Sequence, residues 1–346
     1  MQITTLHKFV RALQDLPRTI VSPVHSKHFR AHGHPVSIVQ RPELGRSVAF
    51  VKTRLGLRFE VNDSPSSFPT YLIKWRLDAL SELLNKCKTH TKGLIDISDG
   101  EDCGEGIVSL CANNPASILI PDPEFIDNRG YAVFHKHAKT APSFMNRSDT
   151  VLWRGVTTGK GIISADGMSG FTPELLQRTR MCLLLKDVEN CDAKFSKIAQ
   201  SQNPEMDAER LKQAGILGEY VPATNWSNYR YHICVDGNTL AWSSTFSRMA
   251  MGCCLIKPGS PGNYKQWYSA MLKPWEHFVP VDTDLSNLIE RIEWCRSNLD
   301  ECARIAARGK DVANQLELKS EMAKAAHLID DAYQAGRLRD PWSEIA

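Results

Sequence analysis

The stretch from residue 229 to residue 260 restricts the fold of this chain more than any other part of its sequence. It opens with an apolar, β-leaning run at 229–235, and a small polar loop then leads into a short apolar-periodic segment that ends at Gly252. A second apolar run follows at 253–256. This order predicts a strand, a loop, a helix and a second strand, the unit from which parallel sheets are built.

Other segments repeat this alternation. An apolar run at 93–97 leads into an acidic loop, and another at 149–155 leads into a turn rich in glycine and threonine. Residues 48–61 alternate apolar and polar side chains around Gly56, which predicts a hairpin, and residues 71–87 follow a strongly amphipathic helical pattern. The sequence therefore predicts an α/β fold.

The length of 346 residues is sufficient for two domains with separate cores. A loose stretch at 135–149 marks the expected boundary, so we assign residues 1–148 to the first domain and 149–315 to the second. Residues 316–346 are expected to form a final helix. Between the strands, we interpret 121–125 as a loop, 174–185 as a helix and 187–215 as polar and helix-leaning.

The overall charge excludes some partners. A net charge of +3 is too small to indicate a protein that binds nucleic acid. The N-terminal region is locally basic, which fits either a solvated face or a surface that meets anionic lipid headgroups or an anionic acceptor. The basic side chains are Lys27, His28, Arg30, Arg41, Arg46, Lys52, Arg54 and Arg58.

Cysteine usage and the N-terminal pattern favour a cytoplasmic protein. None of the 10 cysteines forms a CxxC pair, and residues 1–16 resemble an amphipathic helix rather than a secretory signal. No apolar run reaches the roughly eighteen residues that a membrane span needs. The histidines at 25, 28, 32 and 34 have no helix or strand to fix their spacing, so we expect no metal site there.

Two strand-to-helix turns contain groups that suit a phosphate. In the first, Gly237 opens the loop, and Ser243, Ser244 or Thr245 is expected to cap the helix, with Arg248 one turn further on. Free N–H groups, hydroxyls and the helix dipole favour an anion at such a place. The alternative is that any turn of this kind needs small capping residues.

The second turn, at 153–161, offers Arg154, Gly155, Thr157 and Lys160. Its Gly-Lys order differs from that of a P-loop. Two such turns, each with cations, suit a diphosphate better than either turn alone.

A carboxylate in the first half could take a proton from a hydroxyl nucleophile. Asp99 directly follows the predicted strand at 93–97 and is our candidate for this general base. Nearby carboxylates remain as alternatives: Asp96, Glu101, Asp102, Asp122 and Glu124.

The run LKPWEHFVPVDTDLSNL at 272–288, together with Trp153-Arg154-Gly155, resembles glycosyltransferase family 90. The resemblance covers residues 150–313 well and 94–131 weakly. It implies a GT-B architecture, in which two Rossmann-like domains face each other across a cleft and the C-terminal helix crosses back. Residues 1–148 would then face the acceptor, and 149–315 would bind a nucleotide sugar.

The same resemblance implies roles for individual residues. Arg154 matches the arginine of the family's diphosphate-binding turn, Ser243 matches the serine of its helix-entry loop, and Asp99 stands at its base aspartate. Animal members have additional arginines where this chain has Thr157 and Thr245, and we expect Lys160 and Arg248 to supply the missing charge.

The expected function is an inverting transfer of glucose or xylose from a UDP-sugar to a hydroxyl of a surface glycan, such as lipopolysaccharide core or capsule. No metal cofactor is expected. The sequence leaves open whether the protein contacts the inner face of the membrane. One alternative is an inactive nucleotide-sugar-binding protein. The other is a metal-dependent phosphohydrolase that uses Asp96, Asp99, Asp102 and His135 or His137.

Overall fold

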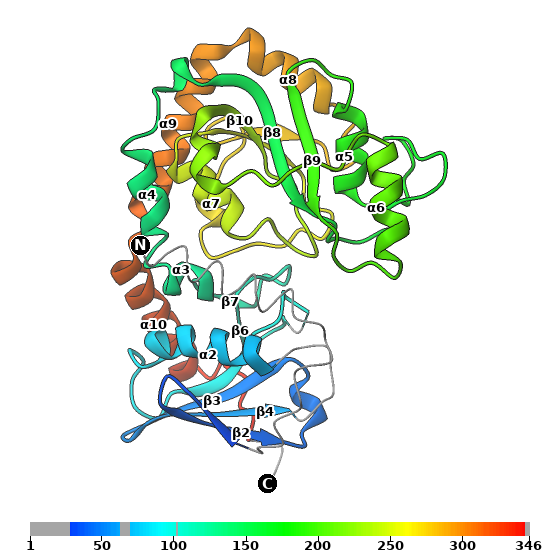
Figure 1. The fold of residues 1–346 in the computed structure, drawn as a ribbon. Helices are drawn as coiled ribbons and strands as arrows, with labels where there is room; N and C mark the ends of the chain where they lie inside the picture. The colour runs from blue at the N-terminus through cyan, green and yellow to red at the C-terminus, as the bar shows by residue number, and fades with distance from the viewer. Residues whose placement is uncertain (1–27, 63–69, 102, 343–346) are drawn as a thin grey trace.

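The computed structural model describes residues 28–62, 70–101 and 103–342, and it shows an α/β protein built on two sheets. Figure 1 shows the N-terminal sheet in the lower part of the molecule and the C-terminal sheet in the upper part. The helix expected at 1–16, together with His25, Lys27 and Asp102, lies outside the described residues.

The N-terminal sheet has seven strands in the order β1-β2-β4-β3-β5-β6-β7. These strands are β1 (His28–Ala31), β2 (His34–Val39), β3 (Ser47–Thr53), β4 (Gly56–Asn62), β5 (Lys92–Asp96), β6 (Ile107–Ser109) and β7 (Ile118–Leu119). The predicted hairpin is β3–β4, in which Thr53 pairs with Gly56 across the turn. Its inward side chains, Phe50 and Phe59, are fully buried.

This sheet is mixed, whereas the sequence predicted a Rossmann-like N-terminal domain. Strand β3 pairs antiparallel with both β4 and β5, and only the β2–β4, β5–β6 and β6–β7 pairs are parallel. The difference follows from the short β3–β4 turn, which leaves no room for the crossover helix that parallel neighbours require.

The C-terminal sheet has five strands in the order β12-β11-β10-β8-β9, and all four pairings are parallel. They are β8 (Ser148–Val156), β9 (Cys191–Lys197), β10 (Tyr229–Ile233), β11 (Cys254–Pro258) and β12 (Val279–Val281). The chain moves outward in one direction from β8 to β9 and in the other from β10 to β12. The order therefore reverses between β8 and β10, and in such sheets ligands bind at the carboxyl ends of the strands on either side of that point.

The described helices are α2 (Thr70–Leu84), α3 (Pro123–Asp127), α4 (Ala132–Ala138), α5 (Gln177–Leu185), α6 (Pro204–Gln213), α7 (Ser243–Ala250), α8 (Leu288–Ser297), α9 (Leu299–Gln315) and α10 (Leu318–Gln334). Three local expectations were wrong. Helix α3 replaces the loop expected at 121–125, because Asp122 caps Phe125 and Pro123 occupies the first turn. Strand β9 occupies part of 187–215, the segment expected to lean helical. Helix α5 begins at Gln177 rather than at residue 174, because residues 172–176 form a turn and a bridge to Ile162.

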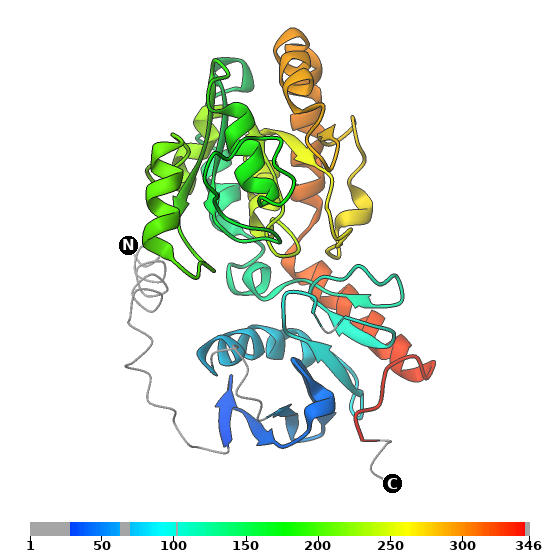
Figure 2. The same cartoon turned by 90° about the vertical axis from the view of Figure 1, so that its right-hand side faces the viewer.

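The last helix, α10, packs against the N-terminal half. Its apolar face joins the core beneath α2, and Figures 1 and 2 show it, coloured red, running beside the lower sheet. Its buried residues there include Met322, Ala326, Ile329 and Ala332.

An aromatic cluster joins the two halves. Phe125 and Tyr131 of the N-terminal half pack against Phe246 of α7, with ring centroids 5.7 and 4.9 Å away. Tyr268 lies 6.0 Å from Phe246 and completes the cluster. The start of α7 is therefore held by residues from both sheets.

None of the helices in the described part of the chain combines the length and the apolar character needed to cross a bilayer.

Two neighbouring residues of α10 test its contribution to the core. Ile329 is fully buried and Leu328 is 42% exposed. We expect Ile329→Ala to lower the free energy of unfolding by about 2–5 kcal/mol, because it removes buried methyl groups and leaves a cavity. Leu328→Ala should cost under about 1 kcal/mol. Urea denaturation of both variants measures the difference, and equal losses would contradict the packing of α10 described above.

Candidate functional site

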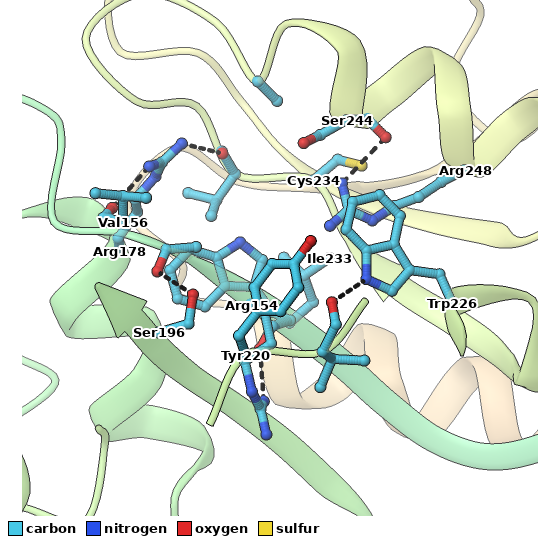
Figure 3. Close-up of a pocket in the computed structure, with 15 residues that line it drawn as sticks. Arg154, Val156, Arg178, Ser196, Tyr220, Trp226, Ile233, Cys234, Ser244 and Arg248 are labelled. Atoms are coloured by element: carbon cyan, nitrogen blue, oxygen red, sulfur yellow. Dashed lines mark hydrogen bonds between the residues drawn. The ribbon is translucent and has the colours of Figure 1, made fainter. Parts of the chain in front are cut away.

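A cavity of about 240 Å³ opens at the point where the strand order reverses. It lies against the carboxyl ends of β8 and β10 and the first turn of α7 (Figure 3). The 15 described residues that line it include three arginines, Arg154, Arg178 and Arg248, and no carboxylate. A pocket with this lining favours an anion.

Arg178, on the first turn of α5, ties the two strand ends together. Its guanidinium donates to the carbonyls of Val156 at 2.8 Å and Asp236 at 2.9 Å, and to the hydroxyl of Thr158 at 2.8 Å. Burial lowers the pKa of Arg178 to about 10, and the nearby charge of Asp236 opposes this shift. The side chain stays charged at neutral pH, and these three partners are neutral groups.

Arg248 reaches the cavity from the other side (Figure 3) and is 2% exposed. Its guanidinium lies 4.3 Å from the ring centre of Trp226, and its Nε donates to Nδ1 of His232 at 3.3 Å. His232 donates from Nε2 to the carbonyl of Trp226 at 2.9 Å, which fixes the neutral tautomer. Burial, and then the charge of Arg248, lower the pKa of His232 to about 3.

Helix α7 begins without a side-chain cap, although the sequence predicted that Ser243, Ser244 or Thr245 would cap it. Its N-cap residue is Trp242, which has a φ of 49°. Ser244 lines the cavity, Ser243 is hydrogen-bonded to Glu124, and the buried Thr245 is hydrogen-bonded to Tyr268. The N–H groups of Ser244 and Thr245 donate instead to the backbone carbonyls of Ala241 and Trp242.

Arg154 lines the same cavity, but its guanidinium is held by other groups. It donates to Oδ2 of Asp192 at 2.6 Å and to the carbonyls of Asp192 and Glu219 at 2.8 and 2.9 Å. For Arg154 to hold a phosphate, some of these bonds would have to break.

Two other predicted residues shape the turn after β8. The hydroxyl of Thr157 donates to the carbonyl of Ala199 and accepts from its N–H, both at 2.7 Å, so it has a structural role here. A Cβ on Gly155 would lie 2.3 Å from the indole of Trp153. Only glycine fits at that position.

A second cavity, of about 140 Å³, lies beside the first, and Arg178 lines both. Its walls include Gly237, Thr239, Lys160 and the buried carboxylate of Asp236. Gly237 is needed here, because a Cβ would lie 2.9 Å from the guanidinium of Arg178.

Asp99 lies in the N-terminal half and contacts residues near this second cavity. Its carboxylate forms an ion pair with Arg76 of α2 at 3.0 Å, and 31% of its side chain is exposed. Cys111 donates to the carbonyl of Asp99 at 3.2 Å and lies 3.7 Å from the hydroxyl of Thr239. One thiol therefore connects the turn of Asp99 to the loop that walls the second cavity.

The alternative carboxylates occupy other places. Asp96 is 1% exposed and accepts from the N–H of Ser98, whereas Glu101 pairs with Arg46 and is largely exposed. Asp122 caps α3. Within the described residues, no group of three or more His, Cys, Asp or Glu side chains could hold a metal ion, so the phosphohydrolase alternative gains no support there.

A parallel sheet with an arginine-lined cavity at its reversal point is typical of proteins that bind nucleotides. Comparisons with known proteins give a more specific class. Residues 174–333 match the sequence model described as glycosyl transferase family 90. The resemblance inferred from the sequence is confirmed.

Individual relatives cover only parts of the chain. A protein of Invertebrate iridescent virus 6, uncharacterized protein 179R, is 30% identical over 178 residues, which are 46% of this chain and 14% of that protein. Human protein O-glucosyltransferase 3 is 25% identical over 177 residues, or 51% of this chain and 30% of the enzyme. This chain thus spans less than a third of either relative.

Among solved structures, the C-terminal domain of a group 1 glycosyl transferase from Francisella tularensis aligns at a TM-score of 0.33 and 16% identity. The alignment covers 57% of this chain and 95% of that domain.

The structure thus brings Arg154, Gly155, Ser244 and Arg248 to the first cavity and Gly237 to the second. It directs the hydroxyls of Thr157, Ser243 and Thr245 to protein partners. Sequence reasoning missed a further set of lining residues, which no motif in the sequence marked. These residues are Arg178, Tyr220, Trp226, Asp236 and Thr239.

The lowered pKa of His232 predicts a pH-dependent stability. Between pH 6.5 and about 3 the unfolded chain binds a proton at His232 that the native protein does not bind, so stability falls as pH falls. We expect the free-energy difference between wild type and His232→Gln to change by up to about 1.4 kcal/mol per pH unit below pH 6.5. Denaturation of both proteins across this range measures it. A flat difference for His232→Gln would contradict the neutral tautomer.

Proposed function

We propose that this protein is an inverting glycosyltransferase that uses a UDP-sugar. The observation that carries the proposal is the first cavity, where the buried Arg248, the partly buried Arg178 and the start of α7 surround a space without a lining carboxylate. A nucleoside diphosphate supplies the negative charge that these groups lack. The match of residues 174–333 to glycosyl transferase family 90 supports the same assignment.

The cavity suggests how the donor is oriented. Tyr220 and Trp226 provide aromatic surface for a nucleobase, while Arg178, Arg248 and the positive end of the α7 dipole suit the diphosphate. The second cavity continues past Arg178 toward Thr239, which Cys111 links to the turn of Asp99. We place the transferred sugar there, between the diphosphate and the base.

In the reaction we propose, the carboxylate of Asp99 takes the proton of an acceptor hydroxyl. The hydroxyl oxygen forms a bond to the anomeric carbon while the bond from that carbon to the β-phosphate oxygen breaks. UDP leaves with the electron pair, and the two arginines stabilise the charge that develops on it. Inversion follows from this single displacement, and no step requires a metal.

The sugar and the acceptor are narrower proposals. Glucose is favoured because curated relatives are named protein O-glucosyltransferases, and xylose follows from the family resemblance. For the acceptor we retain the hydroxyl of a surface glycan. The inactive-binder alternative requires Asp99 to be out of reach, whereas 31% of its side chain is exposed.

We expect UDP to bind in the presence of EDTA, and Arg248→Gln to weaken that binding at least about tenfold, because it removes a buried positive charge facing the diphosphate. Isothermal titration calorimetry measures both. Arg304→Gln, which changes an exposed arginine of α9, is the matched control and should bind normally. Failure of the wild type to bind millimolar UDP would contradict the donor assignment.

Asp99→Asn should abolish transfer and leave UDP affinity within about twofold of wild type, because the amide keeps the shape but takes up no proton. A general base contributes a factor of roughly 10²–10⁴. Turnover with UDP-glucose and a glycan acceptor measures the loss, with Glu101→Gln as the control in the same loop. If Asp99→Asn keeps more than about a tenth of wild-type turnover, Asp99 is not the base.

A further inference from the structure

Glu124 lies where the N-terminal half meets the start of α7. It belongs to α3, which Figure 1 shows between the two parts of the molecule, and its carboxyl group is hydrogen-bonded to Ser243, the first residue of α7. The next residue, Ser244, lines the cavity that we assign to the donor. Glu124 is thus one residue removed from the donor site, although it comes from the opposite half of the chain.

The surroundings of Glu124 disfavour a negative charge. Its helix packs into the aromatic cluster through Phe125, which contacts Tyr131 and Phe246. The charged groups that act on Glu124 are Asp122 and Asp127, and both are acidic. Burial, followed by the charge of Asp122, raises the pKa of Glu124 to about 7.

Asp122 is part of the same arrangement. It accepts hydrogen bonds from the N–H of Phe125 at 2.9 Å, from the hydroxyl of Tyr131 at 3.3 Å and from Gln266 at 3.3 Å. Burial raises the pKa of Asp122 to about 6. These partners hold Asp122 to α3 and to the segment after β11, which leaves Glu124 as the carboxyl group that faces α7.

We propose that Glu124 is a positioning residue of the donor site, which holds the first turn of α7 through Ser243 and carries a proton while the nucleotide sugar is bound. The inference rests on the proposed function, because it takes the donor diphosphate to lie at Ser244.

The physical reason is charge repulsion. A carboxylate at Glu124 would face both Asp122 and an incoming diphosphate, whereas the neutral acid keeps its hydrogen bond to Ser243 without opposing the ligand. Bound diphosphate therefore favours the protonated form. By linkage, the protonated form binds the diphosphate more tightly.

The test is the pH dependence of UDP-glucose affinity in wild type and in Glu124→Gln. UDP-glucose is the probe because its diphosphate has no group that titrates between about pH 6 and pH 8.5, unlike the terminal phosphate of UDP. If the ligand raises the pKa of Glu124 by about one unit, wild-type affinity falls about tenfold across this range. Glu124→Gln stays neutral and keeps a hydrogen-bonding group for Ser243, so its affinity should change less than about twofold.

Two control variants assign the effect. Asp127→Asn removes the weaker of the two acidic neighbours, on the same helix, so it should keep the decline and move it less than Asp122→Asn does. Asp122→Asn should also keep the decline in affinity, but at lower pH, because the loss of that negative neighbour lowers the pKa of Glu124. Calorimetry in two buffers of different ionisation enthalpy should further show proton uptake near pH 7.5 in wild type and none in Glu124→Gln.

The outcomes separate the two proposals. Absence of UDP-glucose binding at every pH overturns the proposed function together with this role of Glu124. Binding whose pH profile is the same in wild type and Glu124→Gln overturns the role of Glu124 alone. A merely structural glutamate would change affinity equally at all pH values, and that result also counts against the proposal.

Discussion

The two cavities of the C-terminal half depend on one partly buried cation. Arg178 donates hydrogen bonds to the carbonyls at the ends of β8 and β10, the two strands between which the order of the C-terminal sheet reverses. The carboxyl ends of parallel strands leave carbonyl oxygens without sheet partners, and a buried guanidinium satisfies several of them at once. The same side chain gives both cavities a positive wall. Gly237 permits this arrangement, because any side chain there would meet the guanidinium.

Charge is divided across the first turn of α7. On the cavity side lie Arg178 and Arg248, whose hydrogen-bond partners described above are neutral. On the opposite side lie Asp122 and Glu124, set among aromatic rings and shifted toward their neutral forms. The start of one helix thus separates a positively charged region from one in which negative charge is disfavoured. The neutral His232 beside Arg248 adds hydrogen-bonding capacity without cancelling the positive charge.

The sequence predicted the order of elements better than their pairing. Strands β5, β10 and β11, the β3–β4 hairpin and helices α2 and α10 follow from local periodicity and turn residues, which are properties of the chain itself. The mixed N-terminal sheet and strand β9 depend on partners distant in the sequence. At the site, the turns after β8 and β10 were identified, but side-chain directions were not. Arg154 and Thr157 stand in the expected turn, yet Asp192 and Ala199 hold them. Arg178 enters from a helix that no motif marked.

The position of α10 has a consequence for how the protein is made. The N-terminal sheet and α2 are complete in sequence by about a third of the chain, but their core includes Met322, Ala326 and Ile329. A ribosome therefore exposes the N-terminal half, with an unfilled apolar face, during the whole synthesis of the C-terminal sheet. The strands and helices of the C-terminal half, from β8 to α9, follow one another in the sequence, so this half can fold first. In this chain the half that is translated first is the one that finishes folding last.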